Sequence, residues 1–236
     1  TSPYLERFTE RIRIGNSEIS EEDVACVTTQ VKDRIEEITA AGFSHPTEFE
    51  IVTAIAMQYF YEKRCDIVVL EVGLGGRFDS TNIIDTPLIS VITSISYDHM
   101  DYLGNTLEEI AFEKAGIIKE GGDVLLYPQQ ENIQALFRDI CRERNARLYE
   151  MDFAGLKPVE FGVEGQVFYY EDFHGLKIRL LGEHQLKNAA LAVKCIQLLN
   201  DKGFSVSRAQ LRKGLEEARW PGRMEIVNTS PLFIVD

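Results

Sequence analysis

The architecture of this chain can be predicted from one segment, DIVVLEVGLGGRFDSTN at residues 66–82. Residues 66–72 form a continuous β-branched run, which is typical of a parallel strand covered on both faces. Glycines at positions 73, 75 and 76 then allow a close approach between the backbone and a ligand. Because ligands of open α/β sheets bind beyond the carboxyl ends of the strands, Glu71 is a candidate metal or substrate ligand. A tight turn in which Glu71 pairs with a basic residue is an equally good interpretation.

Strand-like and helix-like segments alternate on both sides of this loop. Further buried strands are predicted at residues 88–95 and 124–127, and helices at residues 20–42, 47–63, 106–117 and 132–144. Such alternation implies right-handed crossovers and a mostly parallel sheet flanked by helices, so the predicted fold class is α/β.

The pattern changes between residues 147 and 181. Short alternating strands at residues 166–171 and 176–181 predict a small antiparallel β meander, with His174 and Gly175 as the turn. Two more helices are predicted to follow, at residues 184–202 and 207–218.

The sequence Trp220-Pro221-Gly222 breaks the chain and predicts a linker. We therefore expect one domain at residues 1–223, and a linker with the first strand of a second domain at residues 224–236. The chain begins with Thr1 and stops after the apolar run at residues 232–235, so we expect it to be a piece of a longer protein.

The composition excludes several classes of protein. A formal charge of −13 argues against a large nucleic-acid surface, and no apolar run reaches the length of about 18–20 residues that a membrane-spanning helix needs. The four cysteines are far apart and have no metal-binding spacing. We interpret Cys26, Cys65, Cys141 and Cys195 as reduced packing residues of a cytoplasmic protein that binds neither nucleic acid nor membrane.

Four further positions are candidates for chemistry. His99 follows the strand at residues 88–95, so it occupies a strand end equivalent to that of Glu71. Lys114 lies in an apolar stretch near a helix end, where burial favours a neutral amine that can react with CO₂ to form a carbamate. Asn188 lies at a helix start, and Arg223 could hold an anion. Spacing alone leaves a structural interpretation open for each. The histidine could be purely structural, and the lysine could extend its charged end to water. The asparagine could simply cap its helix, and the arginine could be a surface charge.

Seven segments in this order resemble the folylpolyglutamate synthase family, the folate branch of the Mur-type ATP-dependent amide ligases. They are TSPYL at 1–5 with FTERI at 8–12, TEFE at 47–50, the loop at 71–82, Asp98-His99, EKAGIIK at 113–119, HQ at 184–185 with NAA at 188–190, and WPGR at 220–223. The resemblance covers essentially the whole chain. It implies the P-loop-like central domain of a Mur ligase and a reaction that joins a folate or dihydropteroate carboxylate to L-glutamate through an acyl phosphate.

The resemblance also implies roles for individual residues. The catalytic residues would be Glu71, His99 and Lys114. One Mg²⁺ would be held by Ser2 and Glu71, and a second Mg²⁺, or its edge, by His99 and a carbamylated Lys114. The pterin would be bound by Thr47, Phe49, Asp79 and Ser80. The nucleotide, ATP, would be bound by Asn188, Arg223 and Asp236.

The resemblance leaves alternatives open. The parent enzyme, which we expect to be a monomer, could also make dihydrofolate from dihydropteroate. It could instead be another Mur-type ligase, although TEFE at 47–50 and WPGR at 220–223 favour the folate branch. Outside this class, the chain could be a non-catalytic binding module that has kept the fold.

In the family, a Gly-rich phosphate-binding loop with its lysine precedes the segment that resembles Thr1-Ser2-Pro3. We therefore expect this chain alone to be catalytically inactive, because it would lack the amides and the lysine that bind the ATP phosphates. An ATPase assay of the isolated chain with folate and glutamate checks this expectation. Turnover at the rate of a normal ligase would contradict it.

Overall fold

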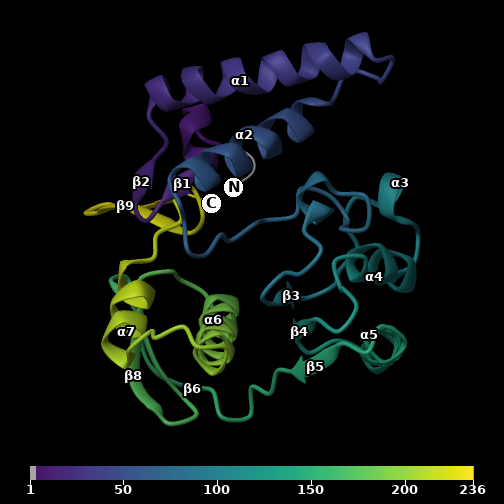
Figure 1. Ribbon diagram of the computed structural model, residues 1–236. Helices are drawn as coiled ribbons and strands as arrows, with labels where there is room; N and C mark the ends of the chain where they lie inside the picture. The colour runs from purple at the N-terminus through teal and green to yellow at the C-terminus, as the bar shows by residue number, and fades with distance from the viewer. Residues whose placement is uncertain (1–3, 236) are drawn as a thin grey trace. The chain divides into compact units, whose positions relative to one another are not determined.

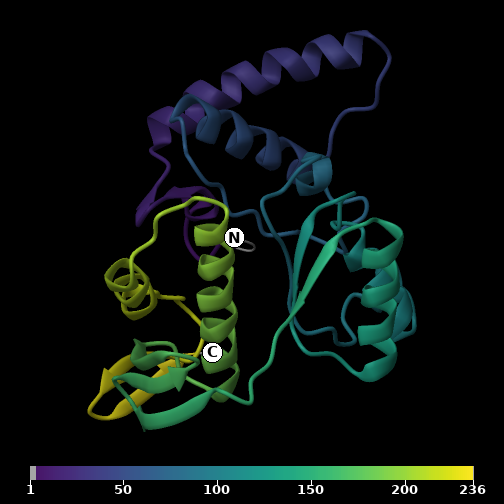
Figure 2. The same ribbon diagram turned by 60° about the horizontal axis from the view of Figure 1, so that its bottom comes forward.

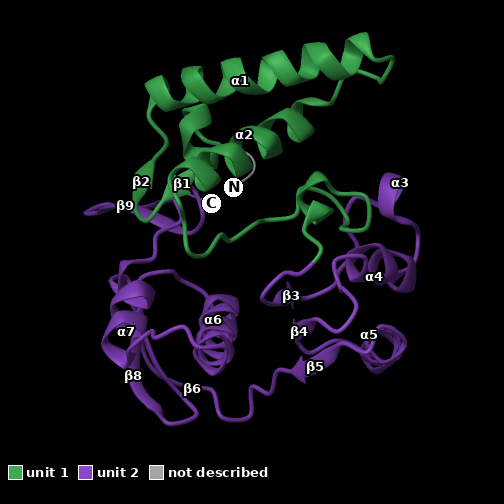
Figure 3. Cartoon of the chain, viewed as in Figure 1, with its two compact units in different colours: residues 1–85 green, residues 86–236 purple. Residues whose placement is uncertain are grey.

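The structure is a computed structural model that describes residues 4–235 (Figure 1). The chain divides into two units, Thr1–Asp85 (unit 1) and Thr86–Asp236 (unit 2), which have different colours in Figure 3. Each unit contains apolar clusters of its own, so the local structure of each can be explained separately.

Unit 1 is built on two helices, α1 (Glu21–Ala40) and α2 (Glu48–Glu62), which confirm two of the predicted helices. Helix α1 begins after Ser20, whose hydroxyl accepts a hydrogen bond from the Asp23 amide at 3.0 Å. The other elements are a 3-10 helix η1 (Phe8–Arg11), a short hairpin of β1 (Arg13–Ile14) and β2 (Ser17–Glu18), and a second 3-10 helix η2 (Ser80–Ile83). The core contains Ile12, Ile19, Val27, Ile55 and Tyr59.

The strand predicted at residues 66–72 is wrong. This segment has neither helix nor strand structure, and no strand in the described part of the chain pairs with it. Most of its side chains are exposed: Val69 is 91% exposed, and Ile67 and Val68 are 37% and 38% exposed, whereas Leu70 and Val72 are half-buried. A β-branched run favours a strand that is covered on both faces, but a strand forms only when a neighbouring strand supplies hydrogen-bond partners for its backbone.

Unit 2 contains a parallel sheet of three strands, in the order β3-β4-β5. The strands are β3 (Ser90–Ile92), β4 (Asp123–Leu126) and β5 (Arg147–Glu150). The first two confirm the predicted strands at residues 88–95 and 124–127 in shorter form. The sequence places residues 147–150 in the region of the predicted meander and predicts no strand there. In the structure they form β5, whose four residues pair in parallel with all of β4.

Helices cover both faces of this sheet (Figures 1 and 2). Val124 and Leu126 of β4 face a cluster that includes Ala111 of α4 (Leu107–Ala115) and Phe137 of α5 (Glu131–Glu143). Leu125, between them, faces a different cluster that includes Leu186 and Ala190 of α6 (Glu183–Asp201). The alternation that strand geometry imposes thus places the sheet between two layers of helices, as the α/β prediction requires.

The predicted meander is present as an antiparallel sheet of β6 (Lys157–Gly162), β7 (Gly165–Tyr170) and β8 (Phe173–Ile178). Its inner face packs against α6, and α7 (Arg208–Glu217) lies beside β8. The predicted turn at His174 and Gly175 is wrong, since both lie within β8. The chain instead reverses at Glu171 and Asp172, where Glu171 has a φ of 49°. A two-residue hairpin loop needs such a positive φ, and here a glutamate supplies it.

The remaining elements are α3 (Met100–Leu103) and a terminal hairpin of β9 (Glu225–Thr229) and β10 (Leu232–Val235). No helix or strand interrupts residues 218–224, where the linker was expected. The proposed domain boundary at residue 223 stays a prediction. None of the helices in the described part of the chain combines the length and the apolar character that crossing a bilayer requires.

The four cysteines are free thiols, and they differ in burial. Cys141 is 2% exposed, and burial raises the pKa of its thiol to about 11. Cys195 is partly buried, which also raises its pKa. Cys65 is half-buried. Cys26 is exposed on α1, so its interpretation as a packing residue was wrong.

We expect Cys26 to react with a disulfide reagent such as DTNB at pH 8 while Cys141 stays unmodified until the protein unfolds. Only about one Cys141 thiol in a thousand is ionised at pH 8, and the apolar core blocks access to it. Mass spectrometry of labelled peptides, with Cys141→Ser as the assignment control, measures both rates. Equal labelling of the two cysteines in the native protein would show that Cys141 is not buried.

Candidate functional site

The glycine-rich loop of unit 1 is organised by Asp79. Its Oδ2 atom accepts hydrogen bonds from the backbone amides of Gly73 (3.0 Å) and Leu74 (2.9 Å). Its Oδ1 atom accepts from the amide and the hydroxyl of Thr81, at 2.9 and 2.5 Å. The Asp79 carboxylate thus receives four donors from its own loop. It closes the loop and begins η2 as the N-cap residue.

The aromatic ring of Phe49 lies directly against this loop. A Cβ atom at Gly73 would lie 2.5 Å from the Phe49 Cε1 and Cζ atoms, so the approach of the ring requires glycine at that position. The Ser80 hydroxyl is 2.8 Å from the Thr53 hydroxyl, one helical turn beyond Phe49 on α2. Three predicted substrate-binding residues, Phe49, Asp79 and Ser80, are therefore gathered at one place.

Thr47, the fourth predicted substrate-binding residue, forms hydrogen bonds with Glu50 at the start of α2. Its hydroxyl and its amide both donate to Glu50 Oε2, at 2.8 and 2.7 Å, and the hydroxyl accepts from the Glu50 amide. These bonds from Thr47 hold the pKa of the Glu50 carboxyl below its usual value. The capping box fixes the first turn of α2, and so it fixes where Phe49 projects.

His99 lies in an unusual backbone conformation beyond β3. Its φ of 49° and ψ of 39° are left-handed values, and it begins the short helix α3. The Asp98 Oδ1 atom accepts from the His99 amide at 2.9 Å and lies 3.8 Å from His99 Nε2. The imidazole is 56% exposed. Left-handed backbone at a residue other than glycine is uncommon and is found disproportionately at ligand sites.

Lys114 is half-buried in the last turn of α4, between the buried residues Ala111 and Ala115. The helix is anchored at its other end by Thr106 and Glu109, which form a capping box. Lys114 and His99 both belong to unit 2, whereas Glu71 is an exposed residue of unit 1. The convergence of all three on one metal nucleotide stays a prediction.

The start of α6 is shaped by a buried amide that the sequence did not reveal. Gln166 of β7 is 1% exposed, and its Nε2 atom donates to the carbonyls of Leu180 (2.7 Å) and Gly182 (3.0 Å). Asn188 donates to Gln185 Oε1 at 3.2 Å, so its side chain lies over the first turn of the helix. A glutamine in an alternating strand gives no signal that it faces inward.

The other predicted nucleotide residues are placed only in part. Arg223 is exposed, and its guanidinium carbon lies 5.8 Å from the centre of the Trp220 ring. Ser2 and Asp236 lie outside the described residues. Among the described residues, no three His, Cys, Asp or Glu side chains group closely enough to hold a metal ion by themselves.

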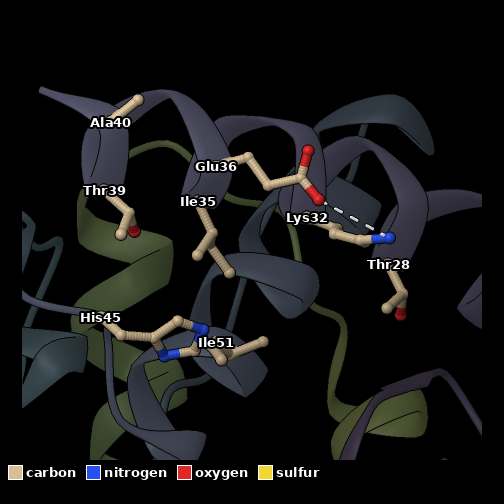
Figure 4. A pocket seen from close by; sticks show the side chains of 8 residues that line it. All are labelled: Thr28, Lys32, Ile35, Glu36, Thr39, Ala40, His45 and Ile51. Atoms are coloured by element: carbon tan, nitrogen blue, oxygen red, sulfur yellow. Dashed lines mark ion pairs between the residues drawn. The ribbon is translucent and has the colours of Figure 1, made fainter.

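A separate hollow of about 550 Å³ lies between α1 and the start of α2 (Figure 4). It is mostly apolar, with an ion pair of Lys32 and Glu36 (3.6 Å) on α1 and with His45 and Ile51 below. No residue predicted to bind substrate, metal or nucleotide lines it.

We expect Asp79→Ala to loosen the loop without unfolding unit 1. The amides of Gly73, Leu74 and Thr81 lose a charged acceptor, so their hydrogen exchange should accelerate at least about tenfold. Exchange measured by mass spectrometry or NMR checks this, with the exposed Asp85→Ala as the matched control. Unchanged exchange at those amides would show that Asp79 does not organise the loop.

Comparison with known proteins relates these features to a family. Residues 19–196 match the Mur ligase middle domain. A dihydrofolate synthase/folylpolyglutamate synthase of Bacillus subtilis is 41% identical over all of this chain and 56% of its own length. A solved structure described as an FPGS-AMPPCP-folate complex is 33% identical, with a TM-score of 0.92 over all of this chain and 59% of that one.

A folylpolyglutamate synthase structure from Thermotoga maritima is 36% identical, with a TM-score of 0.88 over all of this chain and 55% of that one. The chain thus spans a little over half the length of these relatives. The predicted resemblance is confirmed. By its match over residues 19–196, the chain belongs to the Mur ligase middle-domain family, and the relatives to which it is similar are folylpolyglutamate synthases.

Proposed function

We propose that this chain supplies the middle domain of an ATP-dependent ligase that adds L-glutamate to a folate. The observation that carries the proposal is similarity along the whole chain to folylpolyglutamate synthases, one of them described as a complex with AMPPCP and folate. The local geometry supports it, because an aromatic ring against a glycine loop is suited to a flat heterocycle. A binding module without chemistry accounts less well for a histidine with a left-handed backbone and a half-buried lysine in one unit.

The proposed reaction has two steps. An oxygen of the folate carboxylate attacks the γ-phosphorus of ATP, the bond to the β-γ bridging oxygen breaks, and ADP leaves with that electron pair. The amine of glutamate then attacks the acyl carbon, loses a proton, and expels inorganic phosphate to leave an amide. Both steps concentrate negative charge, so the protein must place donors and cations around the phosphoryl group.

We assign the residues of this chain as follows. Phe49 would stack on the pterin, with Ser80 beside it and with Thr47 fixing the helix that carries the ring. Asp79 would act by shaping the loop, since its carboxylate is already occupied by loop donors. Asn188 and Arg223, with Asp236, would contact the nucleotide.

Glu71, with Ser2, would hold one Mg²⁺, and His99, with Lys114, would hold a second Mg²⁺ or lie at its edge. When bound, these ions supply positive charge to the phosphates. The donor set fits this ion, because Mg²⁺ in nucleotide sites commonly takes one or two carboxylates and completes its shell with phosphates and waters. Lys114, if carbamylated, would add one anionic ligand. Glu71 and His99 are both exposed, so a ligand can reach either side chain from solvent.

Two refinements belong to the same proposal. The parent protein could also form dihydrofolate from dihydropteroate, as the name of the Bacillus subtilis relative indicates for that enzyme. A peptidoglycan-type Mur ligase is the competing assignment. Protection against heat by pteroate or folate, without protection by UDP-muramoyl peptides, separates the two.

We further expect a monomeric, cytoplasmic parent protein.

A chimera tests the proposal: this chain replaces the matching 56% of the Bacillus subtilis relative. We expect ATP-dependent addition of glutamate to folate, detected by mass spectrometry of the product. Lys114→Ala in the chimera should lower kcat at least about tenfold, the range seen when groups that support a metal site are removed. The exposed Lys213→Ala is the matched control. A folded chimera without ligase activity would refute the proposed function.

A further inference from the structure

The side chain of Gln129 bridges two strand ends in unit 2. Gln129 lies three residues beyond the end of β4 and just before α5, and it is half-buried. Its Oε1 atom accepts from the Ile95 amide at 3.0 Å. Its Nε2 atom donates to the carbonyls of Thr93 and Tyr127, both at 2.9 Å. Both N–H donors of this amide, and one of the two acceptor positions on its oxygen, are thus bonded to backbone groups.

These bonds continue the pairing of the sheet where the strands stop. The ladder of β3 and β4 ends with Ile92 beside Leu126, after which the Tyr127 amide donates to the Ile92 carbonyl at 2.9 Å. The backbone of residues 93–95 then leaves the sheet. In the described part of the chain, the hydrogen bonds that reach residues 93–98 from other segments come from Gln129. Ile95 adds an apolar contact with the core.

Gln129 is itself held in place from the opposite side. Its amide donates to Gln134 Oε1 at 2.9 Å, and Gln134 is 7% exposed. Gln134 Nε2 donates to the carboxylate of Glu150, which also accepts from Arg138 Nε at 2.8 Å. The Gln134 and Arg138 donors hold the pKa of Glu150 below its usual value. One polar network therefore joins the carboxyl ends of β3, β4 and β5.

We propose that Gln129 is a positioning residue that fixes the segment from Thr93 to His99, and thereby places the His99 imidazole at the edge of the sheet. The inference rests on the proposed function, in which His99 serves the metal nucleotide. The segment is short and its side chains are mostly exposed, so apolar packing alone fixes it weakly. Only three residues separate Ile95 from His99, so the bonds of Gln129 hold the backbone close to the imidazole.

The test uses Gln129→Leu in the chimera, with the adjacent Gln130→Leu as the matched control. Gln130 is exposed, and its side chain makes no cap hydrogen bond to α5. We expect Gln129→Leu to lower kcat about 10–100-fold and to raise the Mg²⁺ concentration for half-maximal rate, while KM for folate stays within about twofold. Gln129→Glu keeps the acceptor for Ile95 but loses the amide donor, so its kcat should lie between wild type and Gln129→Leu.

Hydrogen exchange separates a positioning role from a general loss of stability. Gln129→Leu should accelerate exchange at residues 93–99 and leave the amides of β4 and α6 protected. If Gln129→Leu behaves as Gln130→Leu in kcat, Mg²⁺ dependence and exchange, the inference is overturned, as it is if exchange rises evenly through unit 2. An inactive wild-type chimera would instead defeat the proposed function, and the exchange of residues 93–99 would still report whether Gln129 holds the segment.

Discussion

The complete burial of β4 is the constraint on which unit 2 depends. Val124, Leu125 and Leu126 are each 0% exposed, and successive side chains enter different apolar clusters. One strand of four residues thereby ties α4 and α5 on one face of the sheet to α6 and the meander on the other. Because β3 and β5 pair with this strand, their carboxyl ends are brought level with its own. The polar network and the segment that carries His99 begin from that shared edge.

Much of the fold could be predicted because its signals are local. The hydroxyls of Ser20 and Thr106 each accept a hydrogen bond from the backbone amide three residues later, and so begin a helix. Residue type and spacing are enough to predict this. The failures concern pairing between distant segments. A β-branched run at residues 66–72 shows what environment the segment prefers and does not show which strand, if any, lies beside it. Residues 147–150 likewise lie in the region of the predicted meander, and only their pairing with β4 shows that they belong to the parallel sheet.

The candidate site likewise has a part that could be predicted from the sequence and a part that depends on tertiary structure. The family resemblance implies that Phe49, Asp79 and Ser80 lie together, and in the structure a loop and a helix of the same unit bring them to one place. The role of Asp79 as the acceptor for four loop donors depends on how the loop closes, which residue type does not reveal. Gln129 and Gln166 gave no sequence signal at all, because an amide has no characteristic periodicity. Each acts by joining backbone groups that tertiary structure alone brings near.

The left-handed backbone of His99 narrows the set of residues that this scaffold can accept at one position. The left-handed conformation costs most residues that have a β-carbon about 1–2 kcal/mol, whereas glycine, asparagine and aspartate enter it readily. Histidine is among the few larger side chains enriched there. The residues that the backbone tolerates best carry no imidazole, so relief of strain and retention of the ring oppose each other at this point of the chain. Substitution of His99 by glycine, asparagine or aspartate is therefore expected to relieve the backbone and to remove the imidazole in the same step.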